Sequence, residues 1–91
     1  MIERDTFTTE ENVDFKELIA RKIGYSQEVF YFGETDKGES LYSISKTTAV
    51  VSKDTVSIIG EREDIQNAHK CLENKLSMQL IQFVKSSKYQ K

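Results

Sequence analysis

The chain has 91 residues, of which 37% are hydrophobic and 31% charged, and its formal net charge is −2. A chain of this length forms one domain with a modest core, and it has no apolar run near the ~20 residues that span a bilayer, so we expect no membrane segment and no signal peptide. The slightly negative net charge argues against a protein that holds nucleic acid mainly through phosphates. The lone Cys71 cannot form an internal disulfide, which favours a cytoplasmic or nuclear location.

Residues 1–14 are polar and rich in acids, and we expect them to form an arm outside the folded domain. The next segment fits two structures. Threonines followed by two glutamates at residues 8–11 are typical of a helix N-terminus, and Gly24 would end that helix. Apolar and polar residues also alternate over residues 15–23, which suits a strand. Periodicity alone does not decide between the two.

An aromatic block and a turn follow. The block, residues 29–32, ends at Gly33, and the polar residues 34–38 are typical of a turn. After the turn, Leu41 and Ile44 are three residues apart, which predicts a short helix that its Ser and Thr content weakens.

The last third of the chain predicts a hairpin and a long helix. Two β-branched runs, residues 49–51 and 55–59, flank the polar residues 52–54, as in a β-hairpin. From Glu61 we expect a helix of about six turns or more, with acids early and lysines late, as the helix dipole favours. Its apolar stripe consists of Ile65, Ala68, Leu72, Leu76, Leu80 and Phe83.

The end of this helix predicts a contact with another protein. Met78, Ile81 and Val84 form a second apolar row, so this segment is apolar on more than one side. A small domain cannot bury both sides alone, and packing by the N-terminal arm or by another chain would cover them. We therefore predict an interface for a protein partner or a second copy, formed by Met78, Leu80, Ile81 and Val84.

Two stretches of the chain resemble a type I KH domain. Thr-Val-Ser-Ile-Ile-Gly at residues 55–60, followed by Asp64, Ile65 and Ala68, resembles the last strand and C-terminal helix of that family. Residues 37–51, which begin Lys-Gly-Glu-Ser-Leu, resemble the stretch after its Gly-x-x-Gly loop. The chain is most similar to the KH domains of poly(C)-binding, vigilin and Bicaudal-C type proteins.

The resemblance implies an α+β fold over residues 15–84, with a basic tail over residues 85–91. The implied element order is β-α-α-β-β-α, a three-stranded sheet with three helices packed on one face, and the C-terminal helix is extended. Residues 18–23 would form the first strand, and residues 27–32 the first short helix.

The rival order is α-β-β-β-α, that of a double-stranded-RNA-binding domain, with residues 10–23 as its first helix. That family carries a basic stretch before its last helix, whereas here Gly60 is followed by Glu-Arg-Glu-Asp. Double-stranded RNA is recognised across its phosphates, which three acids would repel. The KH order is therefore preferred.

The KH resemblance also predicts a binding site. In KH domains the Gly-x-x-Gly loop joins two helices, its amides and usual basic residue meet phosphate, and bases lie in an apolar groove beside it. Here four residues separate Gly33 from Gly38, two of them acidic, and Lys37 is the one residue placed to offset them. The resemblance implies single-stranded RNA binding at Phe32, Gly33, Lys37, Gly38, Ser40, Leu41, Val51 and Lys53.

Residues that carry catalysis are not evident. The sequence has no P-loop, no paired-carboxylate pocket and no Ser/His/Asp set, and His69 and Cys71 have no partners at useful spacing. We therefore expect neither an enzyme nor a metal or cofactor site. Two functions are predicted: a single-stranded RNA-binding module of a post-transcriptional regulator, or a divergent KH fold for protein interaction or dimerisation with little nucleic-acid binding.

Overall fold

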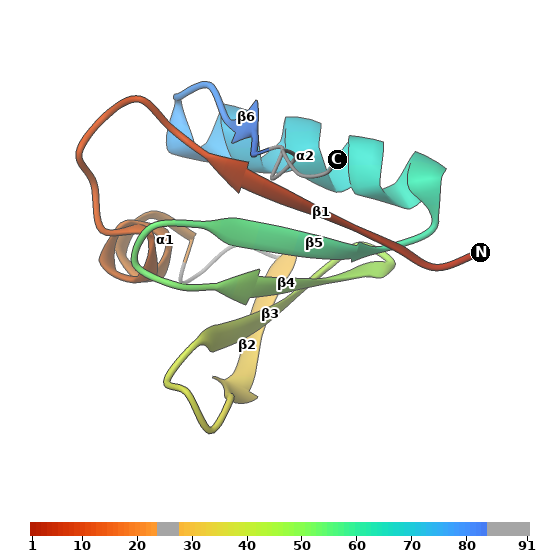
Figure 1. Ribbon diagram of the computed structural model, residues 1–91, viewed down its shortest axis with the longest axis horizontal. Helices are drawn as coiled ribbons and strands as arrows, with labels where there is room; N and C mark the ends of the chain where they lie inside the picture. Colours follow the sequence, from red (N-terminus) through yellow and green to blue (C-terminus); the bar gives the residue numbers. More distant parts are fainter. Residues whose placement is uncertain (24–27, 84–91) are drawn as a thin grey trace, which may run out of the picture.

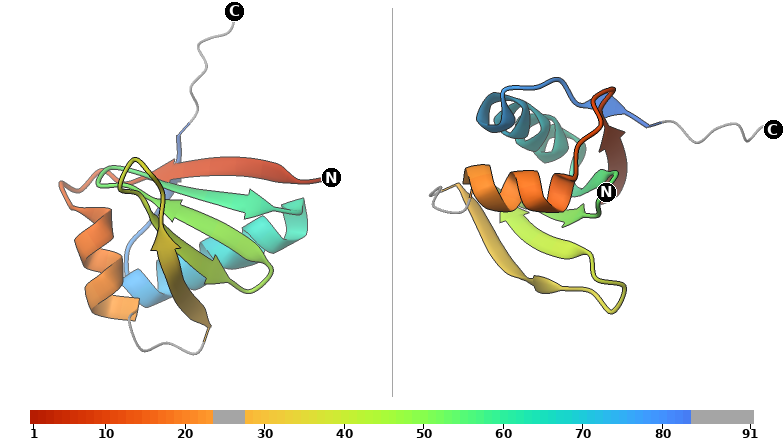
Figure 2. Two further views of the ribbon diagram at one scale, coloured as in Figure 1. Left: turned by 90° about the horizontal axis from the view of Figure 1, so that it is seen from below. Right: turned by 90° about the vertical axis from the view of Figure 1, so that its left-hand side faces the viewer.

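The computed structural model describes residues 1–23 and 28–83 (Figure 1). Its elements, in chain order, are β1 (Glu3–Thr8), α1 (Phe15–Ile23), β2 (Val29–Glu34), β3 (Ser40–Ile44), β4 (Thr47–Val51), β5 (Val56–Gly60), α2 (Arg62–Leu76) and β6 (Ile81–Gln82). The strands pair antiparallel and form one sheet in the order β2-β3-β4-β5-β1-β6. Both helices lie on the same face of this sheet (Figure 2), and the core fills the space between helices and sheet.

The KH fold expected from the sequence is wrong. A KH domain has three helices and a three-stranded sheet, whereas the described residues form two helices and six strands. Where the first short KH helix is expected, over residues 27–32, the chain forms β2 from Val29 on, because aromatic and β-branched side chains favour an extended backbone. The helix expected after the turn is the strand β3, in which Ser40, Tyr42 and Ile44 are buried with a period of two.

For residues 10–23 the structure contains the helix alternative, in a shorter form. α1 begins at Phe15 because Asp14 caps it: Asp14 Oδ1 accepts hydrogen bonds from the backbone N–H groups of Lys16 (3.0 Å) and Glu17 (3.3 Å). The strand that the KH resemblance implies over residues 18–23 is therefore also wrong. The buried residues of α1 recur at helical spacing and are Phe15, Leu18, Ile19 and Ile23.

Part of the expected N-terminal arm belongs to the sheet. β1 pairs with β5 on one side and with β6 on the other. Its Asp5 side chain is turned inward, and the residue is only 8% exposed. Arg62, at the start of α2, donates two hydrogen bonds to the Asp5 carboxylate and one to Glu3. Because this carboxylate occupies an inward-facing position of β1, the strand lacks the apolar alternation by which strands are usually recognised.

The last helix is shorter than the sequence predicts. The predicted apolar stripe is confirmed as far as Leu76, where α2 ends and Ser77 adopts a left-handed φ of 55°. The chain then turns back, and Glu73 Oε2 accepts a hydrogen bond of 2.8 Å from the backbone N–H of Leu80. Leu80 is buried at 2% exposure, so it joins the core from outside the helix.

The predicted β-hairpin is confirmed as β4 and β5. Its turn is closed by Ser52, whose backbone N–H donates to the carbonyl of Thr55 (2.9 Å). The hydroxyls of Ser52 and Thr55 lie 2.9 Å apart and also bond to each other. These strands pair in register over their length and form the middle of the sheet.

The edge strand β2 contains a bulge. Its pairing with β3 shifts register between Tyr31 and Gly33, which leaves Phe32 as an extra residue. Gly33 has a φ of 145°, a conformation that residues with a side chain rarely adopt. Because of the bulge, Phe30 and Gly33 lie on the same face of the sheet, the one that the helices leave open.

We expect Asp5→Ala to destabilise the fold, because Arg62 then loses its main partner and β1 its link to α2. Hydrogen bonds between charged groups contribute about 1.5–3 kcal/mol, so the free energy of unfolding should fall by roughly that amount in a urea titration. The matched control is Asp54→Ala in the exposed β4–β5 turn, for which a change within about 0.5 kcal/mol is expected. Equal stabilities for the two variants would contradict the role given to Asp5.

We expect Gly33→Ala to be destabilising through backbone strain alone. A Cβ added at Gly33 meets nothing within 4 Å, so crowding makes no contribution. A side chain at this φ costs on the order of 1–2 kcal/mol, which thermal or urea unfolding would measure. Ser43→Ala, on the neighbouring strand and the same face, serves as the control. An alanine at position 33 that leaves stability unchanged would mean that the bulge does not need glycine.

Candidate functional site

The residues predicted to bind RNA do not all line one groove. Ser40 and Val51 are buried beneath the helix layer, whereas Leu41 lies on the opposite face of the sheet. Lys53 belongs to the β4–β5 turn, at the same end of the sheet as the β2–β3 turn, and it lines a groove together with Ser40. The other four, Phe32, Gly33, Lys37 and Gly38, lie on β2 and in the β2–β3 turn.

The predicted interface on the last helix is also dispersed. Leu80 is part of the core, and Met78 packs against that core from its rim. Ile81 is exposed on β6, which pairs with β1 and is not helical. Val84 lies outside the described residues, as do residues 85–91. Within the described residues, Met78, Leu80 and Ile81 therefore follow the helix instead of forming two faces of it.

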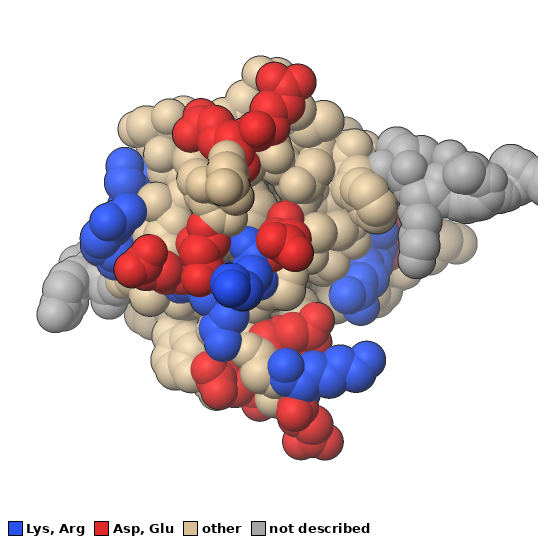
Figure 3. All heavy atoms as spheres, turned by 60° about the vertical axis from the view of Figure 1, so that its left-hand side comes forward, with Lys and Arg blue, Asp and Glu red and all other residues tan. Residues whose placement is uncertain are grey.

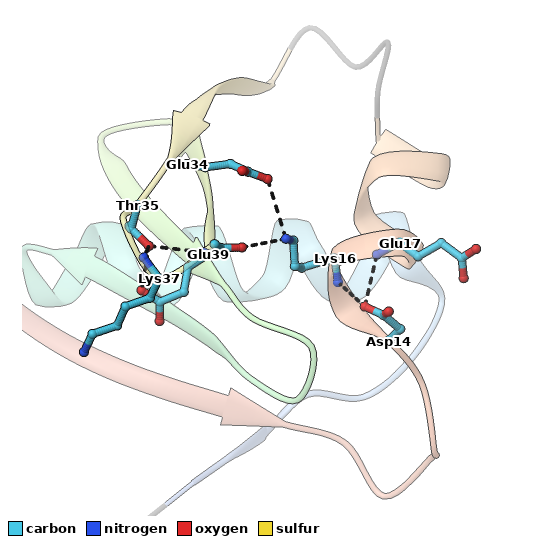
Figure 4. A network of polar contacts seen from close by, with 8 residues as sticks. Asp14, Lys16, Glu17, Glu34, Thr35, Lys37 and Glu39 are labelled. Atoms are coloured by element: carbon cyan, nitrogen blue, oxygen red, sulfur yellow. Dashed lines mark hydrogen bonds and ion pairs between the residues drawn. The ribbon is translucent and has the colours of Figure 1, made fainter.

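The β2–β3 turn is closed on itself. Thr35 organises it: its hydroxyl oxygen accepts hydrogen bonds from the N–H groups of Lys37 (3.3 Å) and Glu39 (3.1 Å), as Figure 4 shows. The N–H of Thr35 donates to Glu39 O (2.8 Å), and the N–H of Gly38 donates to Thr35 O (2.9 Å). These four amides are already paired, so they are not available to bind phosphate as KH loop amides are.

The aromatic edge, which we define as Phe30, Tyr31 and Phe32 on β2, is the main apolar surface of the described residues. Their exposed fractions are 59%, 57% and 55%. β2 is the outermost strand on its side of the sheet, and within the described part of the chain no strand pairs with its outer side. Contiguous exposed apolar side chains on a sheet edge mark a binding surface or an aggregation hazard.

A groove runs along this edge on the helix side. The α1 groove, a cavity of about 610 Å³, lies between α1 and the β2–β3 hairpin. At its floor the Tyr31 ring meets the Tyr42 ring edge-on at 5.5 Å, and burial raises the pKa of the Tyr42 hydroxyl. Lys16 of α1 spans the groove, donating to Gly38 O (2.5 Å) and lying 3.5 Å from a carboxylate oxygen of Glu34 (Figure 4).

Reactive groups have structural roles in the fold. The His69 ring stacks on Phe7 at 4.3 Å, and its Nε2 lies 3.0 Å from the carbonyl oxygen of Leu80. Burial raises the pKa of the Cys71 thiol, which opposes the thiolate that a nucleophile needs. Among residues 1–23 and 28–83, no group of three His, Cys, Asp or Glu side chains is placed to hold a metal ion. The expectation that the protein is not an enzyme stays a prediction.

The same described residues contain no helix with the length and apolarity needed to cross a membrane.

Sequence reasoning did not place the aromatic side chains of residues 30–32 on an edge strand, although a signal was present. Residues 29–32 are all aromatic or β-branched and end at Gly33, which is the pattern of a strand bounded by a turn. The KH resemblance assigned this block to a helix and so concealed that its side chains lie on an edge.

Comparison with known proteins gives no relative from which function could be transferred. No protein-family model matches the chain, and no curated protein or solved structure matches it.

Proposed function

We propose that this chain is a non-catalytic protein-interaction module whose binding surface is the aromatic edge. The observation that carries the proposal is the exposure of three consecutive aromatic side chains, each more than half exposed, on an edge strand. Fully burying an aromatic side chain contributes about 1.5–3 kcal/mol. A partner that covers the exposed parts of these three side chains therefore gains a substantial part of its binding free energy from them.

The backbone of β2 supports the same proposal. An edge strand presents unpaired N–H and C=O groups to which an extended segment of another protein can bond as an added strand. Natural edge strands are usually guarded by lysine or proline, and β2 contains neither. The features of β2 that oppose pairing are its bulge and the charged Glu34 at its end.

The α1 groove supplies specificity beside this edge. Successive side chains of an added strand point to alternate faces, so every second one would lie over the groove. The groove offers two tyrosine rings and a lysine–glutamate pair, which suits side chains with an apolar body and a polar end.

RNA binding stays a prediction that has lost its main support. It rested on a KH groove and on free loop amides, and the β2–β3 turn uses its amides internally. The turn also carries Asp36 and Glu39 beside its one lysine, which opposes phosphate binding.

We expect a displayed library of random extended peptides to yield binders of this protein. Phe30→Ser combined with Phe32→Ser should weaken those binders by about tenfold or more, because each removes an exposed apolar contact. Tyr31 is left unchanged since it packs on Tyr42. The control is Ile2→Ser, an equally exposed apolar residue that precedes β1. Failure to enrich any peptide, or binders that ignore the double variant, would contradict the proposal.

We also expect no measurable binding of a random-sequence single-stranded RNA pool at low salt. Fluorescence anisotropy would measure it, and low salt maximises any phosphate contribution. Binding that Lys37→Glu weakens would instead favour the RNA-binding function predicted from the sequence.

A further inference from the structure

Building on the proposed function, we infer that the partner of the aromatic edge is a second copy of this chain. The two β2 strands pair antiparallel about a two-fold axis perpendicular to the sheet, which joins two sheets into one with all helices on the same side. Such an interface is isologous, so each surface feature must complement its own symmetry mate.

The bulge selects a register for this pairing. Residues directly opposite each other in an antiparallel pair point to the same face. In β2, Phe30 and Gly33 lie on the open face, whereas Val29 and Glu34 lie on the helix side. Opposed residues lie on the same face of the sheet when the two-fold axis passes between Tyr31 and Phe32. Phe30 then lies opposite Gly33 of the second copy, and both are on the open face. A shift by one residue in either direction would set residues of opposite faces against each other.

The selected register also has room for the aromatic rings. Gly33 has no side chain, and a Cβ built on it meets nothing within 4 Å. The Phe30 ring of the second copy would lie over this open space, an arrangement in which an aromatic side chain shields a glycine on the opposite strand. The most exposed of the three aromatic side chains is thereby covered in both copies.

One end of β2 is acidic. The acidic turn, residues 34–39, contains Glu34, Asp36 and Glu39 against the single base Lys37. Lys16 offsets part of this charge through its contact with Glu34. In the space-filling view of Figure 3, carboxylate side chains predominate at the lower end of the molecule, where Figure 1 places this turn.

The other end of β2 is basic. Beside its first residue lies a hollow of about 670 Å³, the basic hollow, whose charged lining residues are Lys22, Lys70, Lys75 and Glu28. Lys75 lies 2.9 Å from Glu28 and lowers the pKa of that carboxyl group. Lys22 and Lys70 are exposed.

Antiparallel pairing brings these opposite charges together twice. Because each strand runs from its basic end to its acidic end, a two-fold axis sets the acidic turn of one copy at the basic hollow of the other. A parallel arrangement would instead set like charges against each other. Charge complementarity therefore favours a second copy in the antiparallel orientation.

The test is a charge-exchange experiment read by sedimentation velocity over a range of concentrations. We expect the wild-type chain to dimerise, and both Glu34→Lys/Asp36→Lys and Lys22→Glu/Lys70→Glu to raise the dimer dissociation constant by about tenfold or more at low salt. An equimolar mixture of the two variants should associate again, because each acidic surface then meets a basic one. Variants that fail to fold would not be rescued by mixing, so restored association separates lost charge contacts from misfolding.

The control is Glu10→Lys/Glu11→Lys, an equal change of charge in the loop after β1, which should leave association unchanged. A wild-type chain that stays monomeric to about 1 mM would overturn the inference. A dimer that neither charge variant weakens would overturn it as well, since it would form through another surface. In either case the proposed function stands if selected peptides still bind through Phe30 and Phe32, and it falls with the inference if they do not.

Discussion

The two helices cover only part of the sheet, and this difference in size decides which side chains stay exposed on the helix side. Six strands at a spacing of ~4.8 Å span about 24 Å from first to last. α2, the longer helix, packs on β1, β4 and β5 and contacts α1 at its side. The β2–β3 hairpin therefore extends past the helices (Figure 2), and Tyr31 on its helix side stays more than half exposed. Phe30 lies on the opposite face of the sheet, which neither helix covers. The α1 groove lies where the part of the sheet that the helices cover meets the uncovered β2–β3 hairpin.

The elements that could be predicted from the sequence are those whose pattern is local. β4 and β5 have β-branched runs on both sides of a polar turn, and α2 has an apolar stripe at helical spacing. β1 could not be recognised, because its inward carboxylate is acceptable only with Arg62, which lies 57 residues along the chain. β3 was misread because Leu41 and Ile44 suit a helical spacing, while burial in fact follows the alternate residues of a strand.

The candidate site shows a different limit of sequence reasoning. A run of aromatic residues is equally suited to a core, a groove or an exposed edge, and only the position of β2 in the strand order distinguishes them. The glycines at positions 33 and 38 were recognised as turn residues, and both do have positive φ. Their separation suggested a nucleic-acid loop, but the conformation of Gly33 belongs to a bulge that changes which side chains share a face. Register of this kind depends on pairing with β3 and cannot be read from spacing.

The opposite edge of the sheet is finished by β6, a strand of only two residues that is tied to β1 by a hydrogen bond of 2.7 Å from Phe83 N–H to Thr6 O. A strand this short presents very few backbone N–H and C=O groups with which another chain could pair. Within the described residues, β2 is therefore the longer of the two outermost strands of the sheet. A second copy that pairs with β2 about a two-fold axis covers the longer outermost strand in both copies, and such a symmetric contact closes the assembly at two chains instead of extending it as a filament.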